Sequence, residues 1–327
     1  MNEAAITAQG LIKRYGEIEA VKGIDLEVRA GEIFGFLGPN GAGKTTTIGI
    51  LCTLLRPTGG KATVAGLDVD RDPDGVRSRI GLVFQDSSLD DQLTARENLQ
   101  FHAFVYDVPR DVQRQRIHEV LQMVELEDRA DSIVKTFSGG MRRRLEIARG
   151  ILHTPEVLFL DEPTVGLDPQ TRRHIWGYLT SLPKREGITV FMTTHYMDEA
   201  EYCDRIAIID HGLIVAQGTP DELKAMVGGD VVTVATADNE AAKLELEQSF
   251  GLRPMIDDGT LRVEVEDGAG FVPRLVRDLT VPVTSVAFRR PSLDDVFLKL
   301  TGRAIREEEA AGNEKFKQIM RARMGRR

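Results

Sequence analysis

The segment GPNGAGKT at residues 38–45 constrains this chain more than any other. It fits the pattern G-x-x-x-x-G-K-[ST] and lies between the apolar stretch EIFGFLG, a predicted strand, and TTTIGILCTLL, a predicted helix. In that setting backbone N–H groups close around phosphate oxygens, a lysine adds positive charge, and a hydroxyl can bind Mg²⁺. We therefore predict a phosphate-binding loop made of Gly38, Pro39, Asn40, Gly41, Ala42, Gly43, Lys44, Thr45 and Thr46.

A second candidate element is VLFLDEP, an apolar stretch that ends in Asp161 and Glu162. A run of apolar residues such as VLFL is typical of a strand buried on both faces of a parallel sheet. At the end of such a strand, Asp161 can hold Mg²⁺ through its water shell and Glu162 can polarise an attacking water. The alternative is a pair of solvated carboxylates at a strand end. The preceding phosphate-binding loop favours the catalytic interpretation.

The third element is the turn formed by Ser138, Gly139 and Gly140, which opens the predicted helix MRRRLEIARGIL. A turn of this kind at a helix N-terminus presents backbone amides and a hydroxyl to an anion, and the helix dipole adds attraction. On its own the turn is also explained as a helix cap followed by a flexible segment. Its place between the two other elements makes it a candidate nucleotide contact.

Taken together, residues 6–218 resemble the ATP-binding subunits of ABC transporters, and the resemblance assigns further residues. The matches are Tyr15 to the aromatic residue that stacks on adenine, Gln85 to the Q-loop, Phe137–Met141 to the signature LSGGQ, Asp168 to the D-loop and His195 to the switch histidine. Phe137 and Met141 depart from the family's leucine and glutamine. Because the phosphate-facing atoms belong to Ser138 and the glycine amides, we expect function to survive.

The resemblance implies that ATP and Mg²⁺ bind here, with Gln85 joining Thr45 and Asp161 around the metal. It further implies that Lys44, Glu162, His195 and Gln85 support hydrolysis. Each newly assigned residue has an alternative: Gln85 as a surface amide, Tyr15 as a half-buried strand residue and His195 as a structural histidine. Asp168 is also placed to cap a helix that begins at Pro169.

The pattern of apolar runs and helix-period segments predicts an α/β fold, a P-loop NTPase domain over residues 1–227 with a helical subdomain at about 88–152. Residues 228–303 follow the order β-α-β-β-α-β, which predicts a small ferredoxin-like α+β domain. Ser292 and Asp295 form a candidate capping box there. The remaining residues, 304–327, are a polar, charged tail, expected to be a solvated helix or a basic contact with lipid headgroups or a membrane partner.

The net charge of −9 argues against a general nucleic-acid binder. No apolar run reaches the roughly 18 residues of a membrane span, and the two cysteines lack metal-binding spacing. PSLDDVFLKLTGR resembles the end of the daunorubicin-resistance type of subunit, which serves ABC-2 exporters. That resemblance implies a homodimer that meets a separate permease at the cytoplasmic face of the plasma membrane. The rivals are a non-transport ABC ATPase acting on ribosomes or DNA, and a regulatory subunit with slow hydrolysis.

Overall fold

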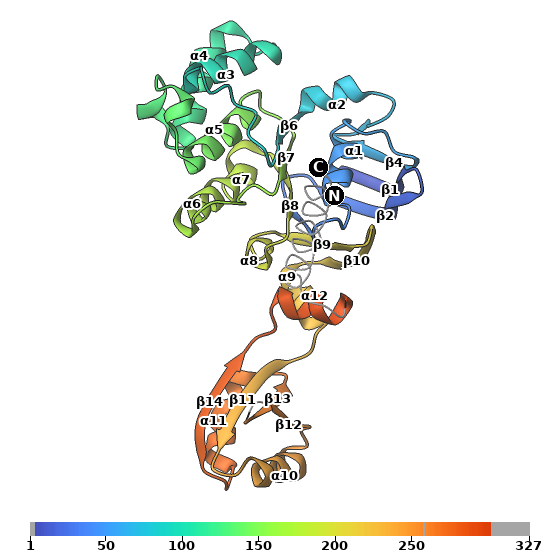
Figure 1. The fold of residues 1–327 in the computed structure, drawn as a ribbon, viewed down its shortest axis with the longest axis vertical. Coiled ribbons are helices and arrows are strands. Elements are labelled where there is room, and N and C mark those ends of the chain that lie inside the picture. The colour runs from blue at the N-terminus through green and yellow to red at the C-terminus, as the bar shows by residue number, and fades with distance from the viewer. Residues whose placement is uncertain (1–3, 258, 302–327) are drawn as a thin grey trace, which may run out of the picture. The chain divides into compact units, whose positions relative to one another are not determined.

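The structure, a computed structural model, describes residues 4–257 and 259–301. These residues form two compact units, divided between Thr219 and Pro220 (Figure 1). The division lies eight residues before the boundary expected after residue 227. The helix α9 (Pro220–Ala225) explains the difference, because it packs against α12 (Leu293–Thr301) of the second unit. The predicted tail at 304–327 lies outside the described residues.

The first unit is built on a six-stranded sheet with the order β10-β9-β3-β8-β7-β6. Its strands are β3 (Ile33–Leu37), β6 (Ile80–Val83), β7 (Val157–Asp161), β8 (Thr189–Thr194), β9 (Arg205–Asp210) and β10 (Leu213–Gly218). All neighbouring pairs are parallel except β9 with β10. Every residue of β3, β7 and β8 is buried, and for β7 the continuous apolar run VLFL predicted this. The carboxyl ends of these three strands therefore meet at one edge.

A second sheet, of order β2-β1-β4-β5, was not among the sequence-based expectations. It is antiparallel and consists of β1 (Ala4–Tyr15), β2 (Ile18–Arg29), β4 (Gly59–Val64) and β5 (Leu67–Asp68). The register between β1 and β2 shifts at several places, one of them between Ala8 and Leu11. Such irregularities interrupt the alternation of apolar residues that identifies a strand from sequence.

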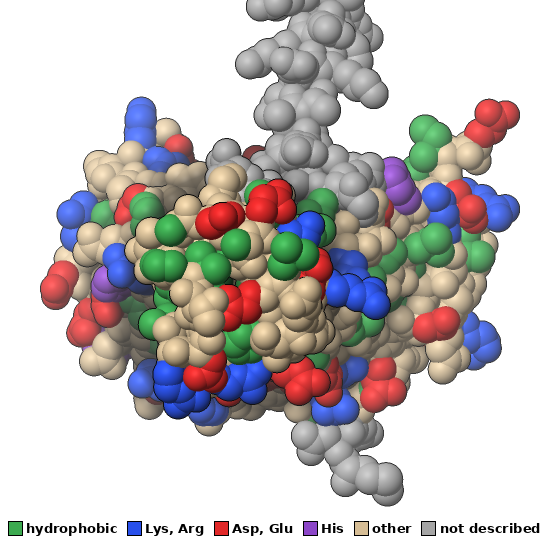
Figure 2. Space-filling model, turned by 90° about the horizontal axis from the view of Figure 1, so that it is seen from below, with side chains coloured by type: hydrophobic (Ala, Val, Ile, Leu, Met, Phe, Trp, Pro, Cys, Tyr) green, Lys and Arg blue, Asp and Glu red, His purple; other side chains and the backbone are tan. Residues whose placement is uncertain are grey.

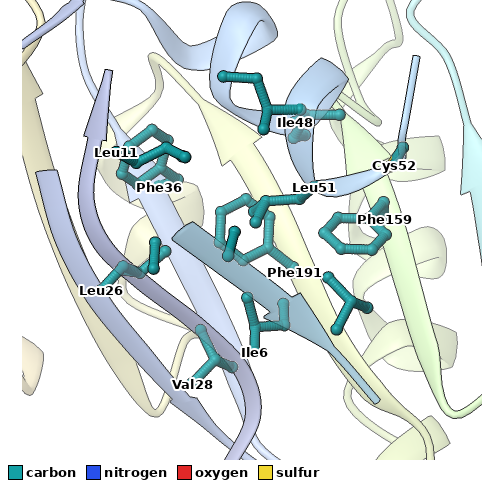
Figure 3. Packing of buried hydrophobic residues seen from close by; sticks show 14 of the residues in the cluster. Ile6, Leu11, Leu26, Val28, Phe36, Ile48, Leu51, Cys52, Phe159 and Phe191 are labelled. Atoms are coloured by element: carbon teal, nitrogen blue, oxygen red, sulfur yellow. The ribbon is translucent and has the colours of Figure 1, made fainter. Parts of the chain in front are cut away.

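The main core lies between these two sheets and around helix α1 (Lys44–Leu51), as Figure 3 shows. The ring centroid of Phe191 is 5.7, 5.6 and 5.5 Å from those of Phe34, Phe36 and Phe159. Burial of one such side chain stabilises a fold by about 1.5–3 kcal/mol. These rings come from β3, β7 and β8, so the core holds in place the strands whose ends precede the candidate site residues.

The other helices of the first unit include the expected helical region. They are α2 (Pro73–Arg79), α3 (Ala95–Val105), α4 (Arg110–Met123), α5 (Gly139–Ile151), α6 (Pro169–Leu179), α7 (Leu182–Glu186) and α8 (Met197–Ala200). Helices α3, α4 and α5 pack together (Figure 1). The apolar spacing of residues 171–183 predicts one continuous helix, but the structure divides this stretch between α6 and α7, and Pro183 lies in the first turn of α7. Proline lacks the N–H that a continuing helix needs, so it begins a new one.

The second unit contains a four-stranded antiparallel sheet of order β12-β13-β11-β14 with two helices. Its elements are β11 (Asp230–Thr236), α10 (Asn239–Phe250), β12 (Met255–Asp257), β13 (Thr260–Val265), α11 (Gly268–Asp278) and β14 (Val283–Arg289). The order β-α-β-β-α-β and the ferredoxin-like α+β class are confirmed. So is the capping box: Ser292 N donates to Asp295 Oδ2 at 2.9 Å, and Asp295 N to Ser292 Oγ at 3.3 Å.

Candidate functional site

The phosphate-binding loop connects β3 to α1, and tight packing against its surroundings requires glycine at two of its positions. A Cβ atom at Gly38 would lie 2.3 Å from the carbonyl oxygen of Ile209. One at Gly43 would lie 2.6 Å from Ala20 O, and the φ of Gly43 is 110°. Because α1 begins at Lys44, the N–H groups of this turn lie at a helix N-terminus. The loop therefore has the form of an anion cradle.

Lys44 is folded back over this cradle and is only 4% exposed. Its Nζ donates to Gly38 O at 2.8 Å and to Pro39 O at 3.2 Å, and lies 3.2 Å from Glu162 Oε1. Thr47 Oγ1 donates to Gly43 O at 2.9 Å and fastens the loop to the first turn of α1. Thr45 is exposed, so its hydroxyl is accessible to a ligand. These contacts place the ammonium group where a phosphate in the loop would meet it.

Glu162 is the centre of a buried polar cluster at the ends of β7 and β8. Its Oε1 lies 3.1 Å from His195 Nδ1 as well as close to Lys44 Nζ. Its N–H donates at 3.1 Å to the hydroxyl of Thr193, which in turn donates to Asp161 Oδ1. The structure thus brings together three residues that are 33 or more positions apart in the sequence, Lys44, Glu162 and His195, and joins Asp161 to them through Thr193.

The charge state of Glu162 follows from two opposing effects. Burial by itself raises the pKa of this carboxyl, but the hydrogen bond from His195 and the positive charge of Lys44 outweigh it, so the pKa lies below its ordinary value of 4.5. Glu162 is therefore an anion at neutral pH. An ionised carboxylate near a phosphate-binding loop can accept a hydrogen bond from a water and orient it.

The two threonines that end β8 were missed by sequence reasoning, as was Glu199. Thr193 holds the Asp161–Glu162 pair, and Thr194 Oγ1 donates to Glu199 Oε2 at 2.7 Å. Glu199 is 1% exposed and also accepts a hydrogen bond from Thr164, and burial raises its pKa. Two adjacent threonines ending an apolar run, directly before His195, were the available signal, because a buried strand end needs polar partners.

Ser138, Gly140 and Asp168 lie together in a different place, around a cavity of about 330 Å³. Ser138 caps α5, accepting a hydrogen bond from Met141 N at 3.3 Å. Asp168 caps α6 by accepting hydrogen bonds from Gln170 N and Thr171 N, both at 3.0 Å, which confirms the capping expectation. The residues that line this cavity do not include those of the phosphate-binding loop. One chain therefore presents two separate candidate contacts for a nucleotide.

Gln85 and Tyr15 are both exposed. Gln85 lies two residues after the end of β6, and Tyr15 ends β1 with 46% of its surface exposed and the ammonium of Lys13 at 5.2 Å from its ring centroid. Gly139 follows Ser138 as the first residue of α5. An exposed aromatic ring beside a cation is available to stack on a nucleobase, and an exposed amide at a strand end is available to a ligand.

Comparison with known proteins decides the family. Residues 21–165 match the family model described as "ABC transporter", and residues 218–301 match "ATP-binding protein DrrA1-3-like, C-terminal domain". The daunorubicin resistance ATP-binding protein DrrA3 of Streptomyces coeruleorubidus is 43% identical over 95% of this chain and 100% of its own length. This chain belongs to the ATP-binding subunits of ABC transporters, of the daunorubicin-resistance type.

Two further similarities place this ABC subunit among its relatives. Nod factor export ATP-binding protein I of Ralstonia nicotianae is 40% identical over 92% of this chain and 95% of that protein. An ATP-binding cassette solved as a dimer in a post-hydrolysis state bound to ADP and Pi is 31% identical, with a TM-score of 0.59, and covers 65% of this chain and 98% of the cassette. The P-loop NTPase fold expected from the sequence is thereby confirmed.

Proposed function

We propose that this chain binds MgATP at the P-loop and hydrolyses it to drive an ABC-2 type exporter. The observation that supports the proposal is the contact of Lys44, Glu162 and His195 at the strand ends beside the loop. A phosphate cradle, a cation and an ionised carboxylate are the groups that phosphoryl transfer to water requires. The two glycines that cannot carry a Cβ atom supply the cradle.

The residues act by position and charge. Backbone amides of the loop bind phosphate oxygens. The ammonium of Lys44 gives up its hydrogen bonds to Gly38 O and Pro39 O and balances the charge of the γ-phosphate. Glu162 accepts a hydrogen bond from the attacking water and directs its lone pair at phosphorus, while His195 holds the carboxylate and reaches the γ-phosphate. The side chains of Lys44, Glu162 and His195 are at most 9% exposed, so bulk water has little access to these three groups.

Mg²⁺ would be held by the Thr45 hydroxyl, by Asp161 through water and by the Gln85 amide oxygen. Hydroxyl, carboxylate and amide oxygens are the hard ligands that this ion prefers, so the residues fit it. When bound, the ion supplies positive charge to the β- and γ-phosphate oxygens. Asp161 is positioned for this by its hydrogen bond from Thr193, which leaves its second oxygen for a water.

The test is the replacement Glu162→Gln, which keeps the shape of the side chain but removes its charge. We expect MgATP binding, measured by equilibrium titration, to be retained and turnover to be lost, because the cradle is untouched. Lys44→Ala should instead weaken binding itself. Near-normal ATPase activity in Glu162→Gln would overturn the assignment of Glu162.

The active unit in this proposal is a homodimer, in which Ser138 of one chain completes the site built on Lys44 of the other. The support is that one chain carries the two contacts in different places: Ser138 lines the 330 Å³ cavity with Asp168, whereas Lys44 contacts Glu162. A relative of the same fold was solved as a dimer. A mixture of Lys44→Ala and Ser138→Arg subunits, each inactive alone, should regain part of the activity, because one site of the mixed dimer is then intact.

Transport in this proposal needs a separate permease, to which the subunit binds peripherally at the cytoplasmic face of the plasma membrane. Among residues 4–257 and 259–301, none of the helices is long and apolar enough to cross a bilayer. On the face that Figure 2 shows, basic side chains lie among acidic and apolar ones, which does not favour a nucleic acid as partner. The relatives' names refer to daunorubicin resistance and to Nod factor export, so we propose export of a drug, antibiotic, lipid or polysaccharide.

A further inference from the structure

Helix α5 carries a buried arginine whose contacts the function described so far does not use. Arg143 is 7% exposed, and its guanidinium donates four hydrogen bonds. Nε donates to Pro163 O at 2.6 Å, Nη2 to Asp161 O at 3.2 Å, and Nη1 to Phe84 O and to Glu146 Oε2, the latter at 3.0 Å. A buried guanidinium that donates mainly to backbone carbonyl groups fixes the position of the backbone segments that carry them.

The carbonyl groups that Arg143 binds lie next to the proposed catalytic residues. Asp161 and Pro163 are the neighbours of Glu162 on either side, and Phe84 immediately precedes Gln85. One rigid, planar group therefore holds both the backbone that carries the water-orienting carboxylate and the start of the segment that carries Gln85.

The backbone at Glu162 needs such support. Its φ is 46°, in the left-handed region, which costs a residue with a side chain about 1 kcal/mol or more. A strained residue keeps its conformation only where its surroundings hold it. Arg143 binds the carbonyl before Glu162 and the carbonyl after it, and Thr193 binds its N–H.

Glu146 extends the same support to the other side of Gln85. While Oε2 pairs with Arg143, Oε1 accepts a hydrogen bond from Ser88 N at 2.9 Å. Glu146 is 3% exposed. The segment 84–88 is thus bound at Phe84 by Arg143 and at Ser88 by Glu146, and both residues come from the helix that Ser138 caps.

We infer that Arg143 is a positioning residue for ATP hydrolysis: it holds Glu162 in its catalytic conformation and in register with Gln85. This inference rests on the proposed function and adds a residue to it. Through Glu146 it also connects segment 84–88 to the carboxylate, so a displacement of that segment moves the group that orients water.

The competing explanation is that Arg143 only stabilises the fold, and Arg116 is a matched control. Arg116 is 14% exposed, donates to Ile151 O at 3.0 Å and Leu152 O at 3.3 Å, and pairs with Glu186 at 2.8 Å. It therefore binds carbonyls and a carboxylate at the opposite end of α5, away from Glu162. Loss of either arginine leaves comparable buried groups without a donor.

The experiment compares Arg143→Gln, Arg143→Lys and Arg116→Gln in the full chain, with steady-state ATPase measured well below the unfolding temperature of every variant. We expect Arg143→Gln to lower kcat about 10- to 100-fold, as small misplacements of catalytic groups do, and KM for ATP to change less than about threefold. Arg143→Lys should recover part of kcat, because an ammonium can still donate to some of the carbonyls. Arg116→Gln should lose similar thermal stability and keep kcat.

Two results would overturn the inference: wild-type kcat in Arg143→Gln, or an equal loss of kcat in Arg143→Gln and Arg116→Gln. The Glu162→Gln variant separates this failure from failure of the proposed function. If Glu162→Gln still turns over, the proposed function is at fault. If Glu162→Gln is inactive while Arg143→Gln is not, only the positioning role is wrong.

Discussion

The pair formed by Lys44 and Glu162 leads to a quantitative prediction about the nucleotide-free protein. The two charged atoms are 3.2 Å apart, and their side chains are 4% and 9% exposed. At an effective dielectric constant of about 20, two unit charges at that distance attract by about 5 kcal/mol. Because both groups are removed from water, desolvation offsets part of this, and we expect a coupling free energy of about 2–3 kcal/mol.

Lys44→Ala should therefore lower the free energy of unfolding by about 3 kcal/mol, since it leaves Glu162 buried with only His195 as a charge-stabilising neighbour. For a unit of this size that corresponds to a fall in Tm of about 6–12 °C. Adding Glu162→Gln should restore much of the loss, because the buried charge is then gone.

The measurement is a double-mutant cycle of Lys44→Ala and Glu162→Gln in the absence of nucleotide, followed by the fluorescence of Trp176. This is the chain's single tryptophan, 3% exposed in α6, so its signal reports on the first unit. Additivity of the two changes within about 0.5 kcal/mol would refute the reasoning, because independent residues behave in that way.

The effect of pH on the stability of the Lys44→Ala variant has a definite sign. In the wild type, Lys44 and His195 hold the pKa of Glu162 below 4.5, so their contribution to stability is present above that pH and is lost as pH falls through the lowered pKa. In Lys44→Ala the charge of Lys44 no longer lowers this pKa, so we expect the pKa of Glu162 to lie higher than in the wild type. The folded state then binds the proton more tightly, and the deficit of the variant should shrink as pH falls toward 4.5. A deficit independent of pH would contradict this account.

The remaining predictions concern the second unit, the core and the loop. A chain ending at residue 219 should fold and bind ATP. A chain ending at residue 227 should aggregate more, because it retains α9 without the second unit, and the apolar side chain of Leu223, buried in the full chain, is then exposed to water. Gel filtration distinguishes the two chains. Asp295→Asn should destabilise the second unit by about 1–2 kcal/mol at neutral pH, because Arg289 and Ser292 lower the pKa of Asp295 to about 2. Urea unfolding measures the loss of stability of the variant relative to the wild type. If that loss fails to shrink as pH falls from about 4 to 2, the lowered pKa is not its cause. Phe191→Ala should cost about 3–5 kcal/mol through the cavity left among three rings, and a change below 1 kcal/mol would mean that the core collapses freely. Gly43→Ala should abolish ATP binding while the second unit stays folded by circular dichroism, because of its φ of 110° and the contact with Ala20 O.

Sequence alone was sufficient wherever the chemistry depends on neighbouring residues. The phosphate-binding loop requires glycines and a lysine at fixed spacing between one strand and one helix, so Gly38, Gly43 and Lys44 are evident without a structure. The capping of α6 by Asp168 and of α12 by Ser292 and Asp295 depends on residues two or three positions apart. The buried strand β7 was evident from its unbroken apolar run VLFL.

Only the tertiary structure decided what depends on residues far apart in the chain. Nothing in the local sequence shows that Thr193 holds Asp161 and Glu162, or that Arg143 binds the carbonyls of Phe84, Asp161 and Pro163. Backbone carbonyls are present at every residue, so the sequence cannot indicate which of them a buried arginine will meet. The assignment of α9 to the second unit has the same cause, because its partner α12 lies about 70 residues later and contact between the two, not local composition, sets the boundary.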